Sequence, residues 1–311
     1  MDQTDQNLLS RRQFNARCAA FGLTLPALAA TAAEAAERSV RLPDGPKVPA
    51  VGQGAWHLGQ ARHPAAVEEE ALNAGIALGM SLIDTSGNYG NGRSEQFLAH
   101  VIAGQRDKIF LVSKVESDEV AEDGIAKACD ASLGRLGTDH LDLYLLHSPV
   151  PSSEFAHVVA EFEKLRKARK IRLWGVSNFD TGQMEDLFRV PGGRGCATNQ
   201  VAYSLNNRRI EPGVLAWCTK NKMPVMAYSP LGGDNNLVVS NPTLTQIGSA
   251  HGCSAAAVAL AWVIRSGTVI AIPESGSPAH AKENAAALSL TLSPQELQTL
   301  EGAFPAPTGP T

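Results

Sequence analysis

The chain of 311 residues lacks the signatures by which enzymes most often hold a metal ion or a phosphate group. Its eight histidines are scattered, and neither an HExxH nor a CxxC pattern occurs, so no metal site is expected. Gly52 and Gly54 lack the third glycine of the dinucleotide fingerprint, and no GxxxxGK[ST] loop is present. Any nucleotide must therefore bind by another geometry.

Excess charge and clustered cysteine are also missing. The formal net charge is −4, so nothing favours nucleic acid or an anionic membrane surface as a partner. The five cysteines are too widely spaced for a disulfide scaffold and are interpreted as buried thiols. A hydrophobic content of 44% and a charged content of 19% are typical of a soluble globular protein. The length allows one large barrel or two small domains.

The N-terminal segment has the pattern of an export signal. Residues 10–14, SRRQF, contain a twin arginine, and the apolar stretch 18–33 after them is too short for stable membrane insertion. Residues 33–35, AEA, offer a cleavage site. Because this pattern resembles a bacterial twin-arginine signal, we expect residues 1–35 to engage the export machinery and be removed. Residues 36–311 would then form one periplasmic domain; with a non-functional signal, the protein stays in the cytoplasm.

From residue 40 onward, apolar runs of strand length alternate with helical segments. A hairpin with an Asp-Gly turn, residues 40–56, leads into the first strand. Later strand runs begin near Leu82, Ile109, Leu141, Arg172, Thr198, Pro224 and Val269. Helical patterns lie at 64–79, 93–103, 121–136, 154–169, 180–189, 211–221, 254–265 and 278–288. This alternation predicts an α/β protein, a (β/α)8 TIM barrel with an N-terminal β-hairpin.

Two further features bear on this prediction. The longest gap between strands, before Val269, contains a Gly/Asn-rich loop at 232–236 that we expect to be mobile. Ser293, Pro294 and Glu296 form a capping box that starts a last helix. A doubly wound open sheet is the rival architecture, but it normally carries the glycine fingerprint that is absent here.

Three of the apolar runs end on a polar side chain. Asp84, Lys114 and His147 close LID, FLVSK and LDLYLLH, and Tyr89 follows the first run in a short loop. A continuous apolar run is typical of a strand buried on both faces. The carboxyl ends of parallel barrel strands converge on one face, where such barrels carry their chemistry. These four side chains therefore predict a proton-handling site.

Each of the four residues also has an ordinary structural interpretation. Tyr89 alone could cover the barrel rim, Lys114 could be solvated, and His147 could be a structural hydrogen-bond donor. As a set, the Tyr89 phenol suits general acid catalysis. We expect Lys114, paired with Asp84, to lower the pKa of Tyr89. His147 is expected to donate to a substrate carbonyl oxygen and orient it.

Seven motifs carry a family resemblance. In order they are LIDTSGNYG, SKV, LDLYLLH, GVSNF, TNQVAY, AYSPLG and IPES, and they span about residues 40–305. The chain resembles the aldo-keto reductase superfamily, and within it the bacterial reductases of methylglyoxal and related small carbonyls. The resemblance implies a catalytic tetrad of Asp84, Tyr89, Lys114 and His147. It also implies substrate contacts from Trp56 and His147, and cofactor contacts from Ser177, Asn178, Gln200, Tyr228, Ser229, Leu231, Glu274, Ser275, His280 and Asn284.

The sequence departs from the family pattern at three positions. Ser148 stands where the family usually has a tryptophan after the histidine, which predicts a more open pocket wall. Glu274 and His280 replace a lysine and an arginine that usually bind the 2′-phosphate of NADPH. Ser275, Ser277 and the N-terminus of the following helix could still bind phosphate. The family default is therefore NADP(H), and NAD(H) is about equally supported.

The sequence thus predicts a monomeric, NAD(P)H-dependent aldo/keto reductase. It would reduce small aldehydes or ketones to alcohols by hydride transfer, with Tyr89 as the general acid. Two alternatives stay open: a non-catalytic nicotinamide-binding barrel subunit, and a barrel enzyme that uses Lys114 as a Schiff base.

Overall fold

The computed structural model describes residues 38–233 and 238–306. The expected export signal lies outside the described residues, as does most of the loop expected to be mobile. The unit Arg38–Thr311 begins with the predicted hairpin, in which β1 (Ser39–Arg41) pairs with β2 (Lys47–Pro49) in antiparallel fashion. Within the described ranges, none of the helices has the length and apolar character of a membrane span.

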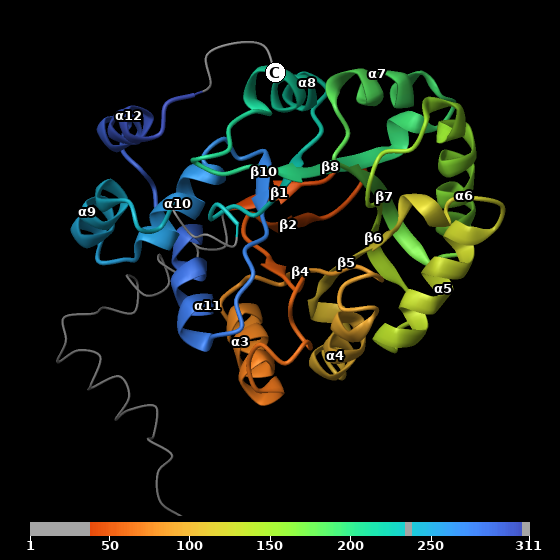
Figure 1. Ribbon diagram of the computed structural model, residues 1–311, viewed down its shortest axis with the longest axis horizontal. Coiled ribbons are helices and arrows are strands. Elements are labelled where there is room, and N and C mark those ends of the chain that lie inside the picture. Colours follow the sequence, from red (N-terminus) through yellow and green to blue (C-terminus); the bar gives the residue numbers. More distant parts are fainter. Residues whose placement is uncertain (1–37, 234–237, 307–311) are drawn as a thin grey trace, which may run out of the picture. The chain divides into compact units, whose positions relative to one another are not determined.

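Eight parallel strands form the predicted barrel. They are β3 (Gln53–Gly54), β4 (Leu82–Asp84), β5 (Phe110–Val115), β6 (Leu141–Leu146), β7 (Ile171–Ser177), β8 (Cys196–Ala202), β9 (Val225–Tyr228) and β10 (Val269–Ala271). Each strand pairs with its neighbour in sequence. The bridges Val51↔Ala271 and Gly54↔Glu274 join the first strand region to the last, with Gly54 N donating to Pro273 O at 2.9 Å. The (β/α)8 prediction is confirmed, and the helices surround the strands in Figure 1.

The helices follow the predicted order, with one addition. They are α3 (Ala65–Ala77), α4 (Arg93–Ile102), α5 (Gly124–Leu136), α6 (Phe155–Lys167), α7 (Thr181–Arg189), α8 (Ala216–Lys220), α9 (Pro242–His251), α10 (Ala255–Val263), α11 (Pro278–Ala285) and α12 (Pro294–Ala303). A π-helical turn, Glu211–Leu215, precedes α8. The additional helix α9 occupies the long gap between β9 and β10. Its apolar signal is weak, because its buried residues are only Leu244, Ile247 and Gly248.

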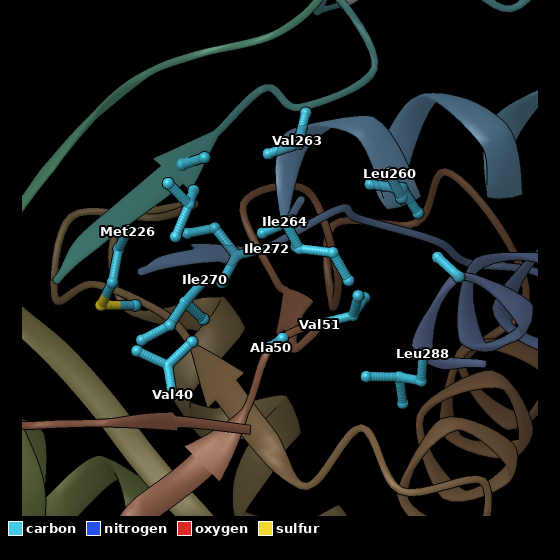
Figure 2. Packing of buried hydrophobic residues seen from close by; sticks show 14 of the residues in the cluster. Val40, Ala50, Val51, Met226, Leu260, Val263, Ile264, Ile270, Ile272 and Leu288 are labelled. Atoms are coloured by element: carbon cyan, nitrogen blue, oxygen red, sulfur yellow. The ribbon is translucent and has the colours of Figure 1, made fainter. Parts of the chain in front are cut away.

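A hydrophobic cluster fixes the closing side of the barrel. Helix α10 is buried from Ala257 to Val263, as expected for a helix covered on all sides. Figure 2 shows Ile264, which follows α10, in one cluster with Ile270 of β10, Ile272 and Val51. This packing holds the start of the β10 loop, which carries Glu274, against the first strand region.

Candidate active site

Two of the other three tetrad residues, Asp84 and Tyr89, contact the Lys114 ammonium. Lys114 Nζ donates to Asp84 Oδ1 at 2.6 Å, to Tyr89 Oη at 3.0 Å and to the Thr85 carbonyl at 2.8 Å. Lys114 and Asp84 are buried. An ammonium group has three protons, and each finds an acceptor here. The negative charge of Asp84 and the contact with Tyr89 raise the pKa of Lys114 despite its burial, so the lysine is held as a cation.

The fully hydrogen-bonded ammonium of Lys114 disfavours the Schiff-base alternative. An imine forms only from a neutral amine with a free lone pair. Lys114 is charged, and its protons are directed to Asp84, Thr85 and Tyr89. The geometry instead makes Lys114 a fixed positive charge beside a phenol.

The pKa of Tyr89 differs in direction from the prediction. Burial raises the pKa of Tyr89 above its ordinary value, and this effect exceeds the lowering by Lys114; Asp84 and Glu116 add smaller upward contributions. The expected net lowering was wrong, because the sequence does not reveal how completely the loop encloses the phenol. Tyr89 therefore keeps its proton near neutral pH, as a proton donor must.

His147 is held by a carboxylate that the sequence interpretation missed. Its Nδ1 is hydrogen-bonded to Glu116 Oε1. Its backbone N donates to Val115 O at 2.9 Å, and its carbonyl accepts from Asn178 Nδ2 at 3.1 Å. Glu116 comes two residues after Lys114, in extended backbone directly after β5, and residues two apart in an extended chain point to the same face. This spacing was the signal that could have identified Glu116.

A cavity of about 720 Å³ opens above this cluster at the carboxyl ends of the strands. Among the predicted residues, its wall contains Trp56, Asp84, Tyr89, His147, Ser177, Asn178, Gln200, Tyr228, Ser229, Leu231 and Glu274. Lys114 is buried behind the wall. Ser148, Ser275, His280 and Asn284 are not among the described residues that line the cavity. Three polar lining residues to which the sequence interpretation gave no role are His57, Arg62 and Asn88.

One side of the cavity is a connected set of amides and hydroxyls. Tyr228 Oη donates to Asn178 Oδ1 at 2.9 Å, and Asn178 Nδ2 donates to Ser177 Oγ at 3.1 Å. Gln200 Nε2 donates to Asp84 Oδ2 at 2.8 Å, which leaves Gln200 Oε1 as an acceptor. Asn178 has φ 62°, a left-handed conformation that is uncommon outside glycine and that often marks functional sites.

These side chains fit the nicotinamide group that the sequence implies. A flat ring with a carboxamide needs an aromatic or apolar face together with fixed hydrogen-bond donors and acceptors. Tyr228 supplies the aromatic face, and the Gln200 oxygen supplies an acceptor. Both Nδ2 protons of Asn178 are donated to Ser177 and the His147 carbonyl, so this amide holds the wall in place. Burial also raises the pKa of Tyr228, so its hydroxyl remains a donor to Asn178.

Comparisons with known proteins agree with this geometry. A sequence profile of the Aldo/keto reductase family matches residues 50–304. The chain belongs to this family. As an aldo/keto reductase, it is an NAD(P)H-dependent oxidoreductase, and the non-catalytic alternative is not favoured.

Three similar proteins illustrate the relationship. Methylglyoxal reductase YeaE of Escherichia coli is 48% identical over 267 residues, which cover 85% of this chain and 94% of that protein. An aldo/keto reductase from Klebsiella pneumoniae, solved in complex with NADP and acetate, has a TM-score of 0.83 and 40% identity, over 88% of this chain and 98% of its own. A Klebsiella pneumoniae structure with NADPH has a TM-score of 0.82 and 41% identity, over 88% and 97% of the two chains.

The carboxylate of Glu274 in this aldo/keto reductase is already bound within the protein. Its Oε2 accepts from His57 N at 2.9 Å, and its Oε1 lies 2.9 Å from His57 Nδ1. The His57 ring stacks on Trp56, with ring centroids 4.3 Å apart. Glu274 thus joins the loops after β3 and β10 across the barrel closure. It is neither turned away into solvent nor free for other ligands.

Proposed function

We propose that this enzyme reduces small aldehydes and ketones of the methylglyoxal class with NADPH. The observation that carries the proposal is the contact between Tyr89 Oη, which lines one large cavity, and the Lys114 ammonium buried behind it. A neutral phenol beside a fixed cation can release its proton to a developing alkoxide and remain stabilised as a phenolate. The similarity to methylglyoxal reductase YeaE supports the substrate class.

Each member of the tetrad has a defined role in this proposal. The bound nicotinamide would supply a hydride to the carbonyl carbon. Tyr89 transfers its proton to the carbonyl oxygen, so that the product is an alcohol. Lys114 stabilises the tyrosinate that remains, and Asp84 stabilises Lys114 as a cation. His147 orients the carbonyl oxygen by a hydrogen bond.

The proposed cofactor is NADPH, with NADH as the weaker alternative. Both Glu274 oxygens have hydrogen-bond partners on His57, which reduces the repulsion that a free carboxylate would exert on a 2′-phosphate. Arg62 adds a cation to the same cavity wall. The Klebsiella pneumoniae structures with NADP and NADPH support this choice.

Steady-state kinetics test the reaction. Residues 36–311 are assayed for carbonyl-dependent loss of NADPH absorbance with methylglyoxal, short aldehydes, small ketones and one bulky ketone, and the assay is repeated with NADH. We expect the highest kcat/KM with the small dicarbonyl and NADPH. Absence of NADPH and NADH oxidation with every carbonyl would contradict the proposal.

We also propose that the protein is exported through the twin-arginine route and acts as a monomer. The support for export is the SRRQF pattern followed by the short apolar stretch. A folded reporter fused after residue 36 should reach the periplasm, whereas the Arg11→Lys/Arg12→Lys fusion should remain in the cytoplasm. A native fusion that stays in the cytoplasm would refute export. Light scattering of the mature enzyme tests the monomer.

A further inference from the structure

The pair formed by Glu116 and His147 has a role that the tetrad alone does not describe. Glu116 Oε1 contacts His147 Nδ1, and the Ser86 hydroxyl lies 3.4 Å from both atoms. The two side chains are only 24% and 18% exposed. The contact is therefore partly shielded from water, and its proton content affects what His147 can do in the cavity.

Counting protons constrains the pair. A carboxylate can only accept, so His147 Nδ1 must carry a proton to bond with ionised Glu116. A neutral imidazole has only one N–H, which would leave Nε2 as a bare acceptor. A substrate carbonyl oxygen is also an acceptor, so a neutral His147 in this arrangement could not bind it. For Nε2 to donate, the pair must hold one additional proton.

We propose that Glu116 is a positioning residue that keeps His147 doubly protonated, so that its Nε2–H donates a hydrogen bond to the substrate carbonyl oxygen. This inference rests on the proposed carbonyl reduction at the same cavity. Glu116 does not line the cavity and acts through His147. Its carboxylate supplies the counter-charge for the imidazolium and fixes the orientation of the ring. A charged donor makes a stronger hydrogen bond than a neutral one.

The other groups around His147 support this assignment. From the β4 side, the Tyr89 ring meets the imidazole edge-on, with centroids 5.7 Å apart, and its hydroxyl is neutral. Behind Tyr89, the opposite charges of Lys114 and Asp84 are paired at 2.6 Å. From the β7 side, the uncharged Asn178 binds the His147 carbonyl. Among these neighbours, only Glu116 offers an unbalanced charge next to the imidazole.

Glu116 acts on the second proton donor in the same sense. Its negative charge contributes to the raised pKa of Tyr89, although burial contributes more. Both groups that face a carbonyl oxygen would therefore be protonated. The site is thus arranged to donate to oxygen, which favours carbonyl reduction over alcohol oxidation near neutral pH.

Three variants separate orientation from charge. In Glu116→Gln, the amide can donate to Nδ1, which keeps the ring in place as a neutral tautomer with Nε2–H. Glu116→Ala removes both the partner and the charge. Asp118→Asn is the matched control: it removes one charge from the same loop, at an exposed position with no contact to His147 among the described residues.

We expect kcat to fall about tenfold in Glu116→Gln, because the charged donor to the substrate becomes neutral. In Glu116→Ala the imidazole also loses the partner that orients it, so kcat should fall about a hundredfold. NADPH affinity should be unchanged in both variants. Asp118→Asn should match the wild type. Equal kcat in the wild type and Glu116→Gln would overturn the inference.

A spectroscopic measurement keeps the two proposals distinguishable. Nitrogen-15 NMR of labelled histidine, with His147→Asn used for assignment, reports whether each ring nitrogen carries a proton. We expect two protonated nitrogens in the wild type and one in Glu116→Gln. A single protonated nitrogen in the wild type would overturn this inference even if the enzyme reduces carbonyls. Failure to oxidise NADPH with any carbonyl would overturn the proposed function, while the NMR result would still decide the state of the pair.

Discussion

Replacing Tyr89 by phenylalanine removes one oxygen atom from the centre of the site. The structure gives this hydroxyl one strong contact, the 3.0 Å hydrogen bond from Lys114 Nζ. Without it, one ammonium proton loses its acceptor, while those directed to Asp84 and Thr85 remain satisfied. An unsatisfied buried donor costs about 1–3 kcal/mol of stability. We therefore expect a folded, modestly destabilised variant.

The effect on catalysis should be much larger. Loss of a general acid typically lowers the rate by about 10²–10⁴-fold, or roughly 3–5 kcal/mol of the activation barrier. Because the amide and hydroxyl set at Asn178 and Gln200 does not contact the Tyr89 hydroxyl, NADPH affinity should be unchanged. The mutation should thus separate chemistry from binding.

The assay combines three measurements on the wild type and Tyr89→Phe. Urea unfolding gives the stability difference, quenching of protein fluorescence gives the NADPH dissociation constant, and NADPH oxidation with methylglyoxal gives kcat. A kcat within threefold of the wild type would remove Tyr89 from the mechanism. A large loss of NADPH affinity would instead show that the residue mainly supports cofactor binding.

Three other changes test the remaining parts of the site. Lys114→Met should lower the free energy of unfolding by about 3–5 kcal/mol in urea titrations, because it leaves the buried Asp84 carboxylate without its cation. Adding Asp84→Asn should restore part of this loss. Unchanged stability in Lys114→Met would contradict a stabilising ion pair. Glu274→Gln should tighten NADPH binding about fivefold, because repulsion between the Glu274 carboxylate and a nearby 2′-phosphate costs about 1 kcal/mol in water. Equal changes in NADPH and NADH affinity in fluorescence titrations would refute an effect on the 2′-phosphate. Burial raises the pKa of Tyr89 above its ordinary value of 10, and alcohol oxidation needs the phenolate. The oxidation rate should therefore still rise with pH at pH 10. A plateau well below pH 10 would contradict the raised pKa of Tyr89.

The sequence predicted the barrel and the central cluster because both depend on patterns of short range. Strands β5 and β6 are largely apolar, and Lys114 and His147 lie at their carboxyl ends, which barrel topology brings together without further information. The hairpin and the capping box of α12 are likewise local, and both occur as predicted.

The features that were missed depend on contacts between distant segments. The link between His57 and Glu274 joins residues 217 positions apart, and no local pattern encodes it. The direction of the Tyr89 pKa shift depends on how deeply the phenol is buried, which the sequence alone does not reveal. Helix α9 was missed because only a few of its residues face the core.

The first and last strands of the barrel are joined by few contacts. Strand β3 has two residues and β10 has three, and their connection consists of isolated bridges and a few backbone hydrogen bonds. The cavity lies across this joint, with Gly54–His57 on one side and Ile272–Glu274 on the other. A ligand in the cavity therefore contacts both sides of this junction and links the first strand to the last. Occupancy of the active site and the thermal resistance of the whole barrel are thereby coupled.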